Sequence, residues 1–351
     1  MKTKHKIAWV VAAFALAMVA TGGYFYYCYT NKTGPFKQYA LFSDKQKDGY
    51  VFIDTDDNLD SVCLKLKPIA SEKGIKVFRE LAADKERPLQ IRTGRYHITP
   101  DKRIIDVYRL LNGHQQEPLM LTIPETRTMP RMAALISRKL MLDSATIAQA
   151  LCDSAYCQKM GYTTQTIHAL FVPNTYEVYW DMTLDDLMKR MQKEHAAFWN
   201  AERQRKAEVL GLTPIEVATV ASIVDEETAN VAEKPTVAGL YLNRLHLGML
   251  LQADPTVKYA LQDFSLRRIL KKHLEVDSPY NTYKYIGLPP GPIKVPSIKG
   301  LDAVLNAVQH DYIYMCAKED FSGTHNFAAT LKEHLQNASR YQQALNARGI
   351  K

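Results

Sequence analysis

The feature that most constrains this chain lies near its beginning, where residues 7–27 contain no charged side chain. About 20 apolar residues are enough for a helix to span a bilayer. Three lysines within the first six residues precede the stretch, and a basic flank of this kind favours a cytoplasmic N-terminus. We therefore expect residues 1–29 to be a retained membrane anchor and the rest of the chain to lie outside the cytoplasm. A cleaved signal peptide is the alternative, because residues 15–22 offer small side chains that a peptidase accepts.

Length and composition limit the possible architecture of the chain beyond the anchor. The 351 residues, 46% of them hydrophobic, can bury a sizeable core and favour two folded domains. The net charge of +8 suits a juxtamembrane segment or an anionic polymer partner, but no nucleic-acid-binding motif accompanies it, so nucleic acid is not expected. Five cysteines are too few for a disulfide scaffold. Cys152 and Cys157 could bridge in an oxidising compartment, yet we expect free buried cysteines and no metal site.

Local patterns divide the rest of the chain into three parts. Residues 30–45 are a polar linker that contains a Gly-Pro pair. Residues 46–118 mix short strands with one or two helices, which predicts a small α+β module. Residues 119–351 carry longer helical patterns between Pro- and Gly-rich loops, which predicts a larger α+β domain. The expected strands are 51–54, 94–98, 119–123 and 312–317, and the expected helices include 101–111, 129–140, 144–152, 184–206, 237–247 and 298–308.

One stretch of the larger domain, residues 213–228, is predicted to be a single helix. Thr213 supplies an N-cap hydroxyl, Pro214 occupies the first helical position, and Glu216 at the third position completes a capping box. Residues three, four and seven apart share one helix face. The spacing therefore places Glu227 on one stripe with three apolar residues, Val220, Ile223 and Val224.

The position of Glu227 predicts an unusual carboxyl group. Burial disfavours the ionised form and raises the pKa, and a glutamic acid that is protonated near neutral pH can act as a general acid. Asp225 and Glu226 are expected to point to other sides of the helix, where water hydrates them. The alternative is an acidic helix end without function, although acidic residues there oppose the helix dipole.

The chain carries several ordered motifs. They are Ser-Ile-Val-Asp-Glu-Glu at 222–227, Asn-Arg-Leu at 243–245, Leu-Gln-Ala-Asp-Pro-Thr at 251–256, Tyr-Asn-Thr-Tyr at 280–283, Gly-Leu-Pro-Pro-Gly-Pro-Ile at 287–293 and, upstream, Gly-Arg-Tyr-His-Ile-Thr at 94–99. Together they resemble one known family, the YceG-like endolytic murein transglycosylases. The resemblance covers nearly the whole chain, the anchor included.

The resemblance implies both an architecture and an activity. Members cleave peptidoglycan glycan strands internally, between N-acetylmuramic acid and N-acetylglucosamine, and leave a 1,6-anhydro sugar end. Their catalytic acid matches Glu227. The implied fold is α+β, with an N-terminal transmembrane helix, a small LysM-like domain at 46–118 and a catalytic domain at 119–351. The implied location is the bacterial inner membrane with the catalytic domain on the extracytoplasmic side. Glycan strands are the expected partner, cell-wall synthases are candidate partners, and no cofactor is expected.

The implied chemistry needs one carboxylic acid. Glu227 would protonate the leaving glycosidic oxygen and then, as a base, help the C6 hydroxyl of the muramic acid attack the anomeric carbon. Asp254 is the second carboxylate to consider if the enzyme hydrolyses instead; its structural alternative is an Asx turn before Pro255. Further candidates to contact sugars, each with loop scaffolding as its alternative, are Gln252, Asn281, Thr282 and Tyr283.

The sequence leaves other interpretations open. A lysozyme-like hydrolase would act on the same glycan, and a non-catalytic glycan-binding partner of the cell-wall synthases would need no acid. His325 and His334 could contact substrate, but a structural role is the expectation for both.

Overall fold

The structure, a computed structural model, describes residues 18–23 and 49–349. The expected anchor and linker therefore lie largely outside the described residues. Within the described part of the chain, no single helix is long and apolar enough to cross a membrane. One pair of helices with a bend between them, Ala201–Val209 and Pro214–Glu227, would together be long and apolar enough to cross a membrane, by length and composition alone.

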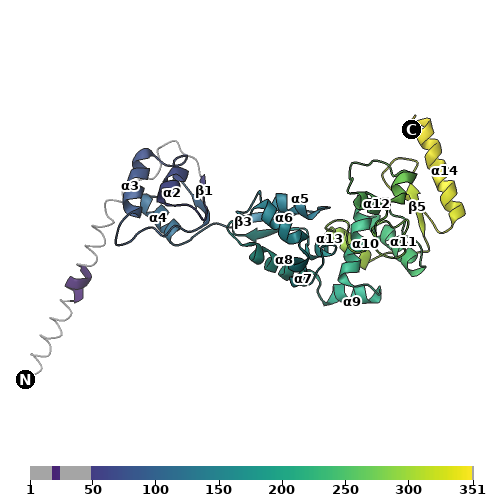
Figure 1. Cartoon of the computed structure of the whole chain (residues 1–351), viewed down its shortest axis with the longest axis horizontal. Coiled ribbons are helices and arrows are strands. Elements are labelled where there is room, and N and C mark those ends of the chain that lie inside the picture. Colours follow the sequence, from purple (N-terminus) through teal and green to yellow (C-terminus); the bar gives the residue numbers. More distant parts are fainter. Residues whose placement is uncertain (1–17, 24–48, 350–351) are drawn as a thin grey trace, which may run out of the picture. The chain divides into compact units, whose positions relative to one another are not determined.

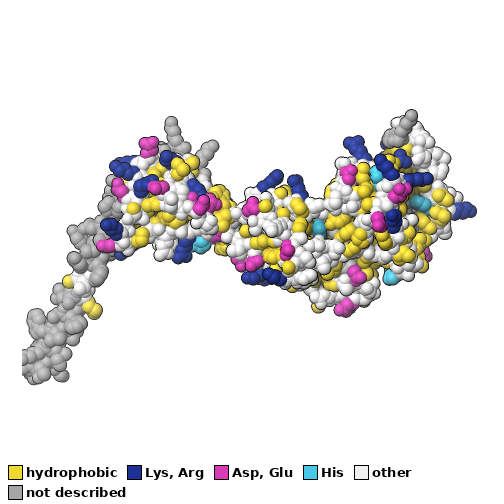
Figure 2. Space-filling view, in the orientation of Figure 1, with side chains coloured by type: hydrophobic (Ala, Val, Ile, Leu, Met, Phe, Trp, Pro, Cys, Tyr) yellow, Lys and Arg dark blue, Asp and Glu magenta, His cyan; other side chains and the backbone are white. Residues whose placement is uncertain are grey.

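The chain divides into two compact units, each of which mixes helices with small two-stranded sheets (Figure 1). The first unit runs to Leu119 and includes Val178–Asp181; the second comprises Met120–Glu177 and the chain from Met182 onward. The predicted α+β class is thus confirmed. On the face drawn in Figure 2, basic and acidic side chains of the described residues are interspersed, so the net charge does not gather into one basic patch there.

In the first unit, a two-stranded sheet and three helices share one hydrophobic core. Strands β1 and β2 are antiparallel, with Val51 opposite Tyr96, and their inward side chains are almost fully buried. Asn58 caps helix α2 by accepting hydrogen bonds from two backbone N–H groups of the first turn. The elements are β1 (Gly49–Ile53), α2 (Leu59–Leu66), α3 (Glu72–Ala82), β2 (Gly94–Ile98) and α4 (Ile104–Asn112).

From β3 onward the chain is mainly helical. The expected helix at 184–206 is two helices, because the Asn200 side chain accepts a hydrogen bond from the backbone N–H of Arg203 and caps a new helix. The elements are β3 (Leu119–Ile123), α5 (Met129–Ile136), α6 (Ser144–Cys152), α7 (Ser154–Lys159), β4 (Asn174–Val178), α8 (Leu184–Phe198), α9 (Ala201–Val209), α10 (Pro214–Glu227), α11 (Lys234–His246), α12 (Asp254–Leu261), α13 (Ile298–Leu305), β5 (Tyr314–Ala317), β6 (His325–Ala328) and α14 (Leu331–Ala347).

Helix α10 is the centre of the second unit. Its N-terminus has the predicted capping box: the Thr213 hydroxyl accepts from the Glu216 N–H, and the Glu216 carboxylate accepts from the Thr213 N–H at 2.8 Å. Every residue from Val217 to Val224 is buried, because α11, α12 and α13 all pack against the helix. Along this stretch the helix therefore exposes no face to solvent. The sequence predicts only one apolar stripe on this helix, and so does not predict burial on all sides.

The expectation that water hydrates the two acidic residues before Glu227 is wrong. The Asp225 side chain is 1% exposed, forms an ion pair with Lys234, and accepts hydrogen bonds from the backbone N–H and the hydroxyl of Ser297. The Glu226 side chain is 15% exposed and accepts from Arg127 at 2.7 Å. Cations and donors from distant segments thus replace water at this helix end.

The four cysteines in the described residues are all free. Cys152 ends α6 and Cys157 lies in α7, with the Asp153 side chain capping the second helix between them. Cys157 and Cys63 are buried, as expected for free cysteines, but Cys152 is exposed. Burial raises the pKa of the Cys157 thiol and keeps it protonated.

The buried pair of Asp225 and Lys234 predicts a large stability effect. In Lys234→Met the Asp225 carboxylate stays buried without its cation, so we expect the free energy of unfolding to fall by about 3–5 kcal/mol. Denaturant titration at pH 7 measures it. The matched control is Lys206→Met, which removes a more exposed pair with Glu202 and a hydrogen bond to Asn306, and should cost about 1 kcal/mol. Equal losses in the two variants would contradict the prediction.

Candidate functional site

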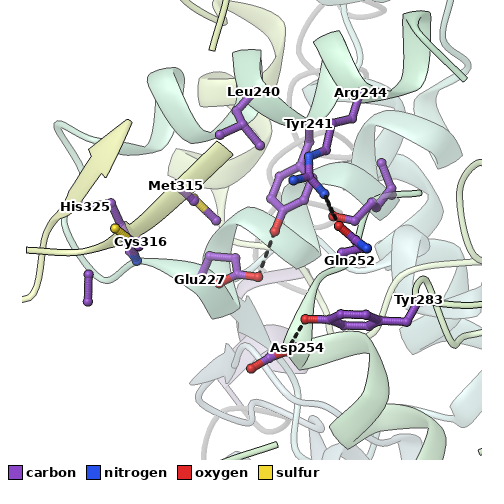
Figure 3. A pocket seen from close by; sticks show the side chains of 12 residues that line it. Glu227, Leu240, Tyr241, Arg244, Gln252, Asp254, Tyr283, Met315, Cys316 and His325 are labelled. Atoms are coloured by element: carbon purple, nitrogen blue, oxygen red, sulfur yellow. Dashed lines mark hydrogen bonds between the residues drawn. The ribbon is translucent and has the colours of Figure 1, made fainter. Parts of the chain in front are cut away.

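A cavity of about 230 Å³ lies beside the C-terminal end of α10 (Figure 3). It is lined by α10, by α11, by the loop that leads into α12, and by residues of β5 and β6. Four of the six residues predicted for the site line it together: Glu227, Gln252, Asp254 and Tyr283. Segments far apart in the sequence thus meet around one acid.

Glu227 is the last residue of α10, and its Oε1 accepts a hydrogen bond from the Tyr241 hydroxyl at 2.8 Å. Desolvation raises the pKa of Glu227 to about 7, even though the Tyr241 hydrogen bond opposes the shift. The negative charge of Asp254 adds to the increase. Among the described residues, no cation lies within ion-pair distance of this carboxyl. Near neutral pH the group can therefore both give and take a proton.

Tyr241 is a site residue that sequence reasoning missed. It comes from α11, is 2% exposed, and reaches Glu227 only because α10 and α11 pack together. Burial and the charge of Glu227 raise the pKa of Tyr241 well above its usual value. The phenol therefore remains a donor to the carboxylate. A tyrosine in a neighbouring helix has no signal of its own in the sequence.

Asp254 is the second carboxyl group at this cavity. It is the first residue of α12, where a carboxylate interacts favourably with the helix dipole, and its Oδ1 accepts from the Tyr283 hydroxyl at 2.6 Å. Burial and this hydrogen bond raise the pKa of Tyr283. Figure 3 shows Asp254 and Glu227 on the same opening, each bound to a different tyrosine.

Gln252 is held at the cavity by its backbone and by an arginine. Its φ of 53° is in the left-handed region, and its N–H donates to the Thr282 carbonyl at 3.0 Å. Its side-chain oxygen accepts from Arg244 at 3.2 Å. Arg244 also lines the cavity and is 7% exposed. It donates to the carbonyls of Leu251 and Ile313, so it ties α11 to the loop before α12 and to the segment that leads into β5.

Asn281 and Thr282, the other two candidates, do not line the cavity. Asn281 is fully buried; its amide donates to the Leu274 carbonyl, and its side-chain oxygen accepts from the Tyr283 N–H. The Thr282 hydroxyl accepts from the Ala253 N–H at 3.0 Å. These contacts fix the loops that present Tyr283 and Asp254. The geometry thus favours loop scaffolding, the alternative considered for both residues.

The two histidines differ in position. His325 lines the cavity, and its backbone N–H and ring Nδ1 lie 2.7 Å and 3.0 Å from the two carboxylate oxygens of Glu233. Glu233 is 9% exposed, so it fixes the imidazole firmly. His334 instead stacks on Tyr314, with 5.2 Å between ring centroids, and does not line the cavity.

The raised pKa of Glu227 predicts how stability depends on pH. Its ordinary value is 4.5, so folding binds a proton between pH 4.5 and about 7, and stability is lost as the pH rises through this window. Glu227→Gln removes that loss. We expect the variant to be more stable than wild type at pH 8, by up to about 3 kcal/mol, and to lose this advantage at pH 4.

Denaturant titrations at both pH values test this expectation. Glu208→Gln, at an exposed position of α9, is the control that should show no comparable pH-dependent gain. A constant difference between wild type and Glu227→Gln across the range would mean that the Glu227 pKa is not raised.

Comparisons with known proteins agree with the family resemblance that the sequence motifs indicate. The model of the YceG-like family matches residues 51–340. A Bacillus subtilis (strain 168) protein named endolytic murein transglycosylase is 29% identical over 258 residues, which cover 68% of this chain and 70% of that protein. A Streptococcus pneumoniae (strain D39) protein of the same name is 25% identical and is matched over 96% of this chain and 66% of its own length.

A solved structure supports the fold independently. A crystal structure of a YceG-like protein from Listeria monocytogenes superposes with a TM-score of 0.54 at 24% identity, and the match covers 83% of this chain and 99% of the other. The family model spans most of the chain, both compact units included. This chain therefore belongs to the YceG-like family.

Proposed function

We propose that this protein is an endolytic peptidoglycan lytic transglycosylase that cleaves between N-acetylmuramic acid and N-acetylglucosamine. The observation that carries the proposal is a carboxyl group, Glu227, with a pKa near 7 in a cavity that it shares with Asp254. The names of the two relatives agree with this activity. The second unit would hold the catalytic centre.

The reaction follows from two protonation states of one group. Protonated Glu227 gives its proton to the glycosidic oxygen as the bond to the muramic anomeric carbon breaks. The resulting carboxylate is stabilised by the Tyr241 hydroxyl. It then accepts the proton of the muramic C6 hydroxyl as that oxygen bonds to the anomeric carbon, which closes the anhydro ring and restores the acid. No water is consumed, and the tethered hydroxyl has a high effective concentration.

Asp254 would assist this step through its charge. Positive charge develops at the anomeric carbon as the glycosidic bond breaks, and a nearby carboxylate stabilises it. A hydrolase would instead use Asp254 to activate water. The Tyr283 hydrogen bond occupies one oxygen of Asp254, which favours the electrostatic role. The sugar end that cleavage creates distinguishes the two mechanisms, because a transglycosylase leaves an anhydro end and a hydrolase leaves a reducing end.

The proposal includes a location. Residues 1–29 would anchor the enzyme in the inner membrane, with residues 46–118 as a LysM-like domain and the catalytic unit on the extracytoplasmic side. The uncharged run at residues 7–27 supports the anchor. Cell-wall synthases are candidate partners there, because they make the glycan strands that are the proposed substrate.

Glu227→Gln tests the catalytic assignment. Glutamine keeps the shape of the side chain but has no proton to transfer, so we expect turnover to fall by about 10²–10⁴-fold. Mass spectrometry of the muropeptides released from purified peptidoglycan should show anhydro ends with wild type and with the control Glu208→Gln. Reducing ends would favour a hydrolase, and unchanged release by Glu227→Gln would refute the assignment.

The pH profile tests the role of Tyr241. Because the acid must be protonated, kcat/KM should fall as the pH rises above about 7. Tyr241→Phe removes a donor that stabilises the carboxylate, so the alkaline limb should move to higher pH while the maximal rate decreases. Tyr285→Phe changes an exposed tyrosine outside the cavity and should leave the profile in place. An unshifted limb in Tyr241→Phe would contradict the mechanism.

A further inference from the structure

A second cavity of about 450 Å³ lies in the same unit, beside the N-terminal end of α5. The segment 124–128 forms one part of its wall, and side chains from α5, α10 and two loops form the rest. Glu226 lines this cavity, whereas its neighbour Glu227 lines the first. Successive helix residues point in directions about 100° apart. The two cavities therefore flank the same end of α10.

Among the charged side chains that line this second cavity, one cation has no carboxylate partner among the described residues. Arg127 donates to Glu226 at 2.7 Å, and Lys294 donates to Glu125 at 2.9 Å. Both carboxylates that line the cavity are thus engaged. Arg131, on the first turn of α5, is exposed and forms no hydrogen bond or ion pair with any described residue. The cavity keeps a positive charge that an anion can neutralise.

Two neutral features add unused hydrogen-bonding capacity. Thr126 is 5% exposed, and its hydroxyl has no hydrogen-bond partner among the described residues. Thr128 is the N-cap of α5 but makes no side-chain capping bond, so the first backbone N–H groups of the helix lack this acceptor. A buried polar group without a partner is costly. An anionic oxygen would accept from these donors.

The remaining wall restricts the kind of anion. Phe264 and Leu135 line the cavity, and the Arg127 guanidinium lies over the Phe264 ring at 5.2 Å. An apolar wall suits a ligand that carries small alkyl groups next to its charge. The carboxylates of Glu125 and Glu226 would repel a multiply charged phosphate group. A single carboxylate on a short peptide fits these conditions.

We propose that the second cavity binds a free carboxylate of the short peptide that murein carries on its muramic acid residues. The inference rests on the proposed function, which makes murein the substrate. Arg131 would pair with the carboxylate, and the wall around Phe264 would contact the peptide side chains. The enzyme should then act better on peptide-bearing strands than on strands stripped of peptide.

Kinetics on two substrates test the proposal. Full-length wild type should have a lower KM for peptide-bearing strands than for strands stripped by an amidase. Arg131→Gln should raise KM about three- to tenfold on peptide-bearing strands only, with kcat unchanged. Arg138→Gln, an exposed position just beyond α5 and outside the cavity, is the matched control. An equal KM change on both substrates, or none on either, would overturn the proposal.

Direct binding separates this proposal from the catalytic one. Full-length Glu227→Gln is titrated with an N-acetylmuramyl tripeptide and with the same compound amidated at its carboxylates. The free acid should bind about three- to tenfold more tightly, and adding Arg131→Gln should abolish the difference. Equal binding of acid and amide would refute the cavity assignment, as would competition by inorganic pyrophosphate. Absence of turnover by wild type on both strands would refute the enzyme function, while this titration would still test the cavity.

Discussion

Three consecutive carboxyl groups end one buried helix, and the site depends on how each is compensated. Acidic residues at a helix C-terminus oppose its dipole, and burial adds a desolvation cost. Asp225 is compensated by the ammonium of Lys234 and by two donors of Ser297. Glu226 is compensated by Arg127. Glu227 has no such cation among the described residues, so a proton is the remaining means of removing its charge.

This division of roles connects stability with chemistry. A glycine at position 300 lets α13 approach α10, because a Cβ there would lie 2.5 Å from an oxygen of Asp225. The packing of α10 against α11, α12 and α13 places its last residue, Glu227, at the cavity. Tyr241 then contributes one hydrogen bond, which stabilises the carboxylate without removing the proton affinity. Structural pairs and a titratable acid thus occupy neighbouring positions of one helix.

Local patterns in the sequence were sufficient where structure depends on nearby residues. The capping box at Thr213, the strand at 94–98 and the helix at 144–152 occur where the sequence predicts them, because caps, alternation and periodicity act within one or two turns. The single helix predicted at 184–206 is two helices in the structure. The apolar periodicity continues through residue 200, so it gives no sign that Asn200 caps a new helix. Glu227 and Asp254 are both predicted to belong to the site, and both line one cavity. That prediction depends on the family resemblance as much as on the spacing of residues in the sequence.

The sequence alone determined which residue types stand at which helix positions, and hence that Glu227 follows an apolar stretch and is a candidate acid. Only the tertiary structure decided that Asp225 and Glu226 are paired, that Tyr241 donates to Glu227, and that Asn281 supports a loop. The reason is physical. A carboxyl group's pKa depends on the water, charges and donors within a few ångströms, and in this fold those neighbours come from segments distant in the chain.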